Sequence, residues 1–248
     1  MTMKVEQRFS QGLQVLAAFT WSKTMDEVSE IQTQGGNVKN DPQYAYRKDL
    51  DRGVAAYDQT RRFITSLLYE FPFGKGKQWL NSRGVVNALL GGWQANTILT
   101  FADGLPFTIS CYCADRAQTG NNRNNERMDL VGSPVPSGFT KTIYQQFDTS
   151  AFKTPALGTL GTVGRNTLRG PGQRAVDLSL FKNFRVQERF AVQFRAEAFN
   201  LIASPYYTNI YPGYNASATD FGSLVPVGGD GGNIFNPRIY QMALRFTF

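Results

Sequence analysis

Apolar side chains recur at every second position in seven segments of this chain. The last segment shows the pattern most clearly, with Tyr240, Met242, Leu244, Phe246 and Phe248 alternating with Gln241, Ala243, Arg245 and Thr247. A β-strand places alternate side chains on opposite faces, so each segment is predicted to be a strand with one apolar and one polar face. The predicted strands are residues 4–9, 13–22, 62–71, 93–102, 173–186, 190–201 and 238–248.

The connections between these segments alternate in length. Residues 10–12, 72–92 and 187–189 form the shorter connections, and residues 23–61, 103–172 and 202–237 form the longer ones. A membrane barrel has short periplasmic turns and long extracellular loops, whereas a β-sandwich has no reason to alternate in this way. The sequence therefore predicts an all-β fold: about seven strands of an antiparallel, up-and-down transmembrane β-barrel. The final strand is expected to run inward.

Composition and charge narrow the class of protein. Apolar residues make up 42% of the chain and charged residues 18%, with Gly 24, Phe 19 and Tyr 11, which favours strands joined by turns over a disordered tail. The net charge is +7, but the Lys and Arg residues are scattered without a dense basic run. A nucleic-acid partner is therefore not expected.

The chain contains no histidine, which removes the commonest general base and the commonest metal ligand. The two cysteines, Cys111 and Cys113, share one face of an extended strand, and a disulfide between them would need a bend. Two thiolates alone make a poor zinc site, so packing or loop cysteines are the favoured interpretation. The sequence predicts no enzyme activity, no catalytic residue, no metal site and no cofactor.

Polar positions of the predicted strands are candidates for the surface of the pore. Arg195 and Glu197 lie two residues apart and share the polar face of one strand. Turning an arginine to lipid at the bilayer midplane would cost about 2–4 kcal/mol, so this face is predicted to line the lumen. Asp177, Gln94 and Asn96 occupy the same kind of position. Arg195 and Glu197 either contact something inside the pore or form a structural charge pair.

Two patterns in the long loops invite a chemical interpretation and do not carry one. Glycines 158, 161 and 164 precede Arg165, but no Lys-Ser/Thr pair or helix pattern follows, so a phosphate loop is not expected. Asp26, Glu27 and Glu30 lack the spacing of a calcium loop, and a solvated extracellular loop is the expected setting.

Several blocks of the chain resemble the C-terminal barrel of TonB-dependent outer-membrane receptors, and in particular the Oar-like receptors of acidobacteria. The blocks are AAFTWSKTMDE, YDQTRRFITSLLYEFPFGKGK, LLGGWQANTILTFADGLPFTI, FDTSAFKTP, GTVGRNTLRGPG, VDLSLFKNF and QFRAEAFNLI, in the family's order. The resemblance implies a barrel of about 22 strands around an N-terminal plug. It also implies import of a bulky solute, such as a siderophore or oligosaccharide, with energy from the TonB complex.

Under this resemblance, residues 1–248 are the C-terminal part of the receptor barrel, without its plug and N-terminal domains. No signal peptide is visible at the N-terminus, so the chain is expected to be a fragment of an exported protein. The resemblance also implies that the barrel-assembly machinery reads the terminal strand through Phe248, Phe246 and Tyr240, although the chain could simply end there. The expected partners are outer-membrane lipid, the missing plug and strands, the TonB complex, the assembly machinery and an unknown solute.

Tyrosines crowd the last long loop and provide the basis for an alternative. Tyr206, Tyr207, Tyr211 and Tyr214 could stack on sugars or aromatic siderophores, or could pack against one another within the loop. A secreted all-β carbohydrate-binding module using these rings is the alternative to a receptor fragment. Such a module would fold as a soluble monomer.

Overall fold

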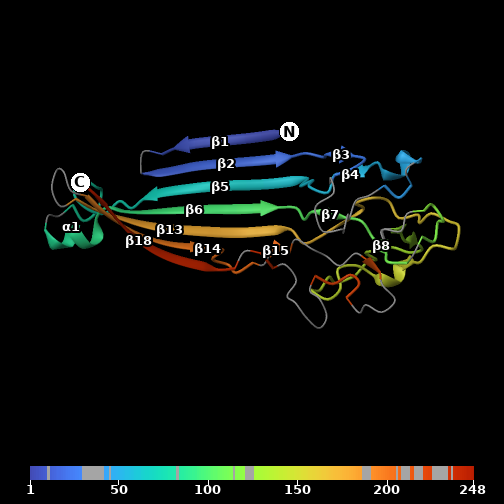
Figure 1. Cartoon of the computed structure of the whole chain (residues 1–248). Helices are drawn as coiled ribbons and strands as arrows, with labels where there is room; N and C mark the ends of the chain where they lie inside the picture. The colour runs from blue at the N-terminus through green and yellow to red at the C-terminus, as the bar shows by residue number, and fades with distance from the viewer. Residues whose placement is uncertain are drawn as a thin grey trace.

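One antiparallel sheet of seven strands dominates the molecule (Figure 1). Its strands, in spatial order, are β1 (Thr2–Arg8), β2 (Leu13–Trp21), β5 (Arg61–Glu70), β6 (Trp93–Ala102), β13 (Gln173–Arg185), β14 (Ala191–Phe199) and β18 (Ile239–Thr247). These are the seven predicted strands, each within two residues of its predicted ends. Every strand pairs with its neighbours along the chain, so the up-and-down order is confirmed.

The computed structural model describes residues 1–9, 12–29, 42–44, 46–81, 84–113, 115–120, 126–185, 191–204, 206–207, 213–214, 220–224, 234–235 and 237–248. For residue 185 and the pairs 206–207, 213–214 and 234–235, the description covers the backbone. Within these residues, no helix has both the length and the apolar character needed to cross a membrane.

The register keeps the apolar rows of neighbouring strands on one face of the sheet. Leu178 lies opposite Thr97 on one side and Ala198 on the other. The next residue, Ser179, lies opposite Asn96 and Glu197. Because cross-strand partners share a face, the strand-by-strand alternation becomes one apolar and one polar surface.

In the part of the chain that the structure describes, neither surface of the sheet is packed against another layer. Large apolar side chains such as Phe19, Trp21 and Phe101 remain exposed on the apolar face. Every residue of the two edge strands, β1 and β18, is exposed, including Tyr240 and Phe246. The sheet is open, with β1 and β18 each paired on one side within the described residues.

The connections separate to the two ends of the sheet (Figure 1). β1 ends and β2 begins at one end of the sheet, as do β13 and β14 respectively, and the C-terminus and α1 (Val85–Leu90) lie at this same end. The sequence predicts only a connection here, since a helix of six residues is too short to show a clear apolar period. The Asn87 side chain accepts a hydrogen bond from the Lys75 amide at 2.6 Å, and the Trp93 indole donates to the Leu89 carbonyl at 3.0 Å. These contacts hold the helix against the end of the sheet.

The long loops at the other end contain short β-bridges and two 3₁₀ turns. The strand pairs are β3 (Met25–Asp26) with β4 (Gly53–Val54), β7 (Pro106–Phe107) with β12 (Leu168–Arg169), β10 (Asp129–Leu130) with β11 (Phe152–Lys153), and β15 (Tyr206–Tyr207) with β17 (Ile234–Phe235). A separate three-stranded sheet joins β8 (Ser110–Cys111) to β9 (Glu126–Arg127) and β16 (Gly213–Tyr214). The 3₁₀ turns are η1 (Lys48–Asp51) and η2 (Thr149–Ala151).

The hydrophobic core of the described chain lies in these loops and not on the sheet. Its buried members are Ile109, Cys111, Met128, Phe147, Ala151, Phe152, Val163 and Leu224. Phe147 packs edge-on against Phe152, with ring centroids 5.4 Å apart, and against Phe221 at 5.2 Å. A large part of the long loops is therefore not irregular, exposed backbone: these segments fold around a core of their own.

Neighbouring residues in the middle of β13 provide a test of the two faces. We expect Leu178→Arg to reduce barrel assembly strongly, because it puts a charge on the apolar face at a cost of about 2–4 kcal/mol. Ser179→Arg should be tolerated, because Ser179 lies on the polar face, 3.4 Å from the Glu197 carboxylate. The measurement is the fraction of heat-modifiable protein in outer membranes. Equal losses in the two variants would contradict the assigned faces.

Candidate functional site

The polar face of the sheet carries a hydrogen-bonded network that crosses three strands. Glu197 on β14 accepts hydrogen bonds from Ser179 on β13, at 3.4 Å, and from Gln241 on β18. Arg195 donates to Gln193 at 2.6 Å, and its guanidinium lies 5.4 Å from the centre of the Phe181 ring. Arg195 and Glu197 share a face as expected, but each bonds to other residues, and no ion pair between them is found in the described part of the chain.

The other candidate residues of this face also have polar partners. Gln94 donates to Glu70 at 3.4 Å, and Asn96 accepts from Ser66 at the same distance. Asp177 accepts the backbone amide of Asn200 at 2.8 Å, where β14 ends. The register places Gln94, Asn96, Asp177, Arg195 and Glu197 on one surface. Their exposure to a pore stays a prediction, because the sheet is open.

The four loop tyrosines are placed only in part. The backbone of Tyr206 and Tyr207 pairs with Phe235 and Ile234, and that of Tyr214 runs parallel to Cys111. For these three residues only the backbone is described, and Tyr211 lies outside the described residues. A stacking platform for sugars or siderophores stays a prediction.

A buried ion pair joins two of the long loops. Arg127 on β9 pairs with Asp51 of η1, and the two side chains are 5% and 3% exposed. Arg127 also donates to the Leu50 carbonyl at 2.6 Å, while Asp51 accepts the Gln43 amide at 3.1 Å. Burial lowers the pKa of Arg127, and the adjacent Asp51 carboxylate opposes that shift. The pair joins the loop before β5 to the loop after β6.

A second buried arginine, Arg165, ties the same loops together. It lies 2.6 Å from the Asp26 carboxylate and donates to the backbone carbonyls of Asp26 and Asp51 at 2.9 and 3.1 Å. Asp26 is thus held by an internal cation, and the expectation of a merely solvated acidic loop is wrong for it. Gly161 packs so closely on the Arg127 carbonyl that an added Cβ would lie 1.8 Å from that oxygen. Gly161 is therefore needed for the close packing of the loop.

A third arginine–aspartate pair attaches the loops to the adjacent end of the sheet. Arg169 donates to the Asp58 carboxylate at 2.5 Å and to the carbonyls of Asp58 and Gly104 at 3.0 and 3.1 Å. Asp58 also accepts the Thr24 amide at 2.7 Å and the Thr60 hydroxyl at 3.0 Å. Burial works to raise the pKa of Asp58, but the hydrogen bonds from Thr24, Arg169 and Thr60 outweigh it and hold the pKa below its usual value.

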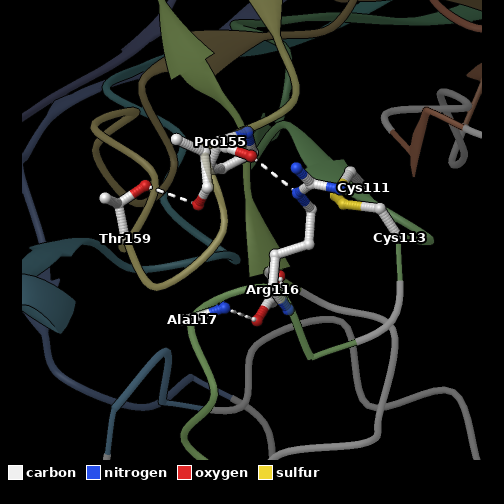
Figure 2. Close-up of a disulfide and its surroundings, with 8 residues drawn as sticks. Cys111, Cys113, Arg116, Ala117, Pro155 and Thr159 are labelled. Carbon is white, nitrogen blue, oxygen red and sulfur yellow. Dashed lines mark hydrogen bonds between the residues drawn. A yellow bond between two sulfur atoms is a disulfide. The ribbon is translucent and has the colours of Figure 1, made fainter.

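The two cysteines are bonded to each other (Figure 2). The interpretation of Cys111 and Cys113 as unbonded packing residues is therefore wrong: β8 ends at Cys111, and the chain bends there as a disulfide requires. Both sulfurs lie within 4.8 Å of a Glu126 carboxylate oxygen. That carboxylate already accepts the backbone amides of Arg116 and Ala117, each at 3.0 Å.

Beside the disulfide, the Arg116 side chain donates a hydrogen bond to the Pro155 carbonyl at 2.6 Å (Figure 2). The sulfurs and the carboxylate are thus engaged with other groups of the loop. This cluster holds distant segments of the loop after β6 together, and its sequence signal is only the spacing of the two cysteines.

The sheet and its connections define a segment of a membrane β-barrel wall: two-faced strands, small turns at one end and folded loops at the other. Residues 1–241 match the protein family described as "outer membrane beta barrel domain". The chain belongs to this family, and its location is the bacterial outer membrane. A search of curated proteins finds no match. The family gives no support to a secreted carbohydrate-binding module.

The buried pair Arg127–Asp51 should stabilise the long loops without affecting the sheet. In Arg127→Met, the Asp51 carboxylate stays buried without its cation, and we expect a loss of about 3–5 kcal/mol in the local stability of the loops. The measurement is hydrogen exchange, compared between residues 46–58 and 126–165 and the sheet strands.

Arg47→Met is the matched control, because it removes a solvent-exposed ion pair. The side chain of Arg47 is 56% exposed and that of its partner Asp49 is 61% exposed. This substitution should change hydrogen exchange in the loops much less than Arg127→Met does, because a solvent-exposed ion pair stabilises little. Loop protection that is equal in the two variants would show that the buried pair does not stabilise the loops.

Asp58 should make the attachment of the loops pH-dependent. Its pKa in the folded protein is lower than in the unfolded chain, where it is about 3.9. The stabilisation is therefore complete above about pH 5, and it decreases as the pH falls from there through the folded-state pKa. Exchange at the Thr24 amide should accelerate, after correction for intrinsic rates, as the pH falls through this range. In Asp58→Asn this amide should be less protected at pH 7 and show a flatter pH profile. The same profile in both proteins would contradict the assignment.

Proposed function

We propose that this chain is the C-terminal wall segment of a TonB-dependent receptor that imports a bulky solute across the outer membrane. The observation that carries the proposal is the open sheet. Among the residues that the structure describes, its seven two-faced strands have no layer on either face, and β1 and β18 are each paired on one side only. Unpaired backbone edges are costly in hydrocarbon, and seven strands are too few to enclose a wide lumen. Further strands of the same barrel would pair with β1 and β18.

The two ends of the sheet support a gated importer in particular. The loops at one end are folded around a core and the arginine–aspartate pairs Arg127–Asp51, Arg165–Asp26 and Arg169–Asp58, which suits a surface that must present a fixed shape to a solute. The polar face below them, with Glu197 and Arg195, would line the pore and contact a plug. The ordered set of sequence blocks that resemble TonB-dependent receptors supports the same class.

The proposed protein transports a solute and carries out no reaction of its own on it. The outer loops would capture a siderophore or oligosaccharide, a plug within the barrel would gate passage, and the TonB complex would supply energy. Residues 1–248 would form the C-terminal part of the barrel. The terminal strand, with Tyr240, Phe246 and Phe248 on its exposed apolar face, would be read by the barrel-assembly machinery.

The intact protein, expressed from the parent gene and purified from outer membranes, tests this proposal. We expect it to bind the purified periplasmic domain of TonB and to show no steady conductance in planar bilayers, because a plug closes the pore. A matched preparation of a porin should conduct and should not bind TonB. A permanently open pore without TonB binding would contradict the proposal and would identify a passive channel.

A further inference from the structure

A groove of about 750 Å³ lies where the apolar face of the sheet meets the outer loops. Its floor follows from the register. Trp21 lies opposite Arg61. The neighbouring row of cross-strand partners, farther from the loops, runs from Phe19 through Phe63 and Phe101 to Arg174. All of these residues share a face with Leu99 and Val176, which belong to the row below. The groove is therefore continuous with the surface that contacts lipid.

The aromatic part of the groove is a ready apolar platform. The rings of Phe63 and Phe101 are stacked, with centroids 6.5 Å apart and planes inclined by 27°. Trp21 is 58% exposed beside them. Aromatic side chains at this level of a membrane barrel contact the boundary between acyl chains and headgroups.

The charged part of the groove is rich in arginine. Arg61, Arg169 and Arg174 line it together with one acid, Asp103. Asp103 binds Arg61 through two hydrogen bonds of 2.9 and 3.0 Å, and Arg169 is directed to Asp58. Arg174 is exposed, and within the described residues no acceptor or carboxylate partner is found for it. The groove therefore has an excess of positive charge and one guanidinium available for an anion.

We propose that this groove binds a phosphate-bearing membrane lipid. The phosphate would bond to Arg174 and to the exposed side of Arg61, and the acyl chains would cover Phe63 and Phe101. Arginine is suited to the phosphate, since its planar guanidinium can donate two parallel hydrogen bonds. A free phosphate ion would use the arginines but not the aromatic platform, so a lipid fits the whole groove. The proposal rests on membership of the outer-membrane family and not on the transport function.

The test compares lipids that differ in charge, using the intact protein in detergent and native mass spectrometry. We expect the protein to retain phosphatidylglycerol, and to retain zwitterionic phosphatidylcholine less. In Arg174→Gln, retention of phosphatidylglycerol should fall about tenfold, as expected for the loss of one charge-assisted contact. Arg174→Lys should restore part of it.

Arg62→Gln is the matched control, because Arg62 is exposed on the neighbouring position of β5 but lies on the polar face, opposite Thr20 and Ala102. It should leave lipid retention unchanged, and heat-modifiable mobility shows that each variant has assembled. If Arg174→Gln fails to assemble, Phe101→Leu should weaken retention of phosphatidylglycerol without changing the charge.

Three results would overturn the proposal. The first is equal retention of phosphatidylglycerol by Arg174→Gln and the unmodified protein. The second is displacement of phosphatidylglycerol by inorganic phosphate at the same concentration, which would identify a simple anion site. The third is equal retention of phosphatidylcholine and phosphatidylglycerol, which would show that the groove binds acyl chains alone.

Discussion

A peptide backbone that crosses hydrocarbon must satisfy its N–H and C=O groups within the protein, because no water is present to do so. The seven-stranded sheet meets this requirement by pairing each inner strand on both sides, in one continuous antiparallel register. That register also keeps every second side chain on the same surface from β1 to β18. The apolar surface, the polar surface and the demand for further strands at the two edges all follow from it.

The same constraint explains where the hydrophobic core lies. The sheet has no layer packed on it, since lipid can cover one face and the contents of a pore the other. The long loops extend beyond the end of the sheet and must bury apolar side chains to remain ordered in water. They do so around Phe147 and Ile109, and three arginine–aspartate pairs join segments that are far apart in the sequence. The chain thus combines a wall stabilised by pairing with loops stabilised by packing.

Different parts of the structure were predictable to different degrees, for physical reasons. Alternation is a local property, so the strands and the common face of Asp177, Arg195 and Glu197 could be predicted from spacing alone. The partners on that face could not, because Glu197 turns to Gln241, which is 44 residues away. The pairing of Arg127 with Asp51 spans 76 residues and has no local signal. The bend that allows the Cys111–Cys113 disulfide depends on where β8 ends.

The assignment of the two sheet faces can be measured residue by residue on β13. Single cysteines at positions 176 to 181 can carry spin labels, since Cys111 and Cys113 are bonded to each other and leave no free thiol within residues 1–248. We predict that labels at 176, 178 and 180 collide mainly with oxygen dissolved in lipid. Labels at 177, 179 and 181 should collide mainly with a water-soluble nickel chelate. A collision profile that does not alternate between successive residues would contradict the account. So would labels that are shielded from oxygen and from the nickel chelate at all six positions.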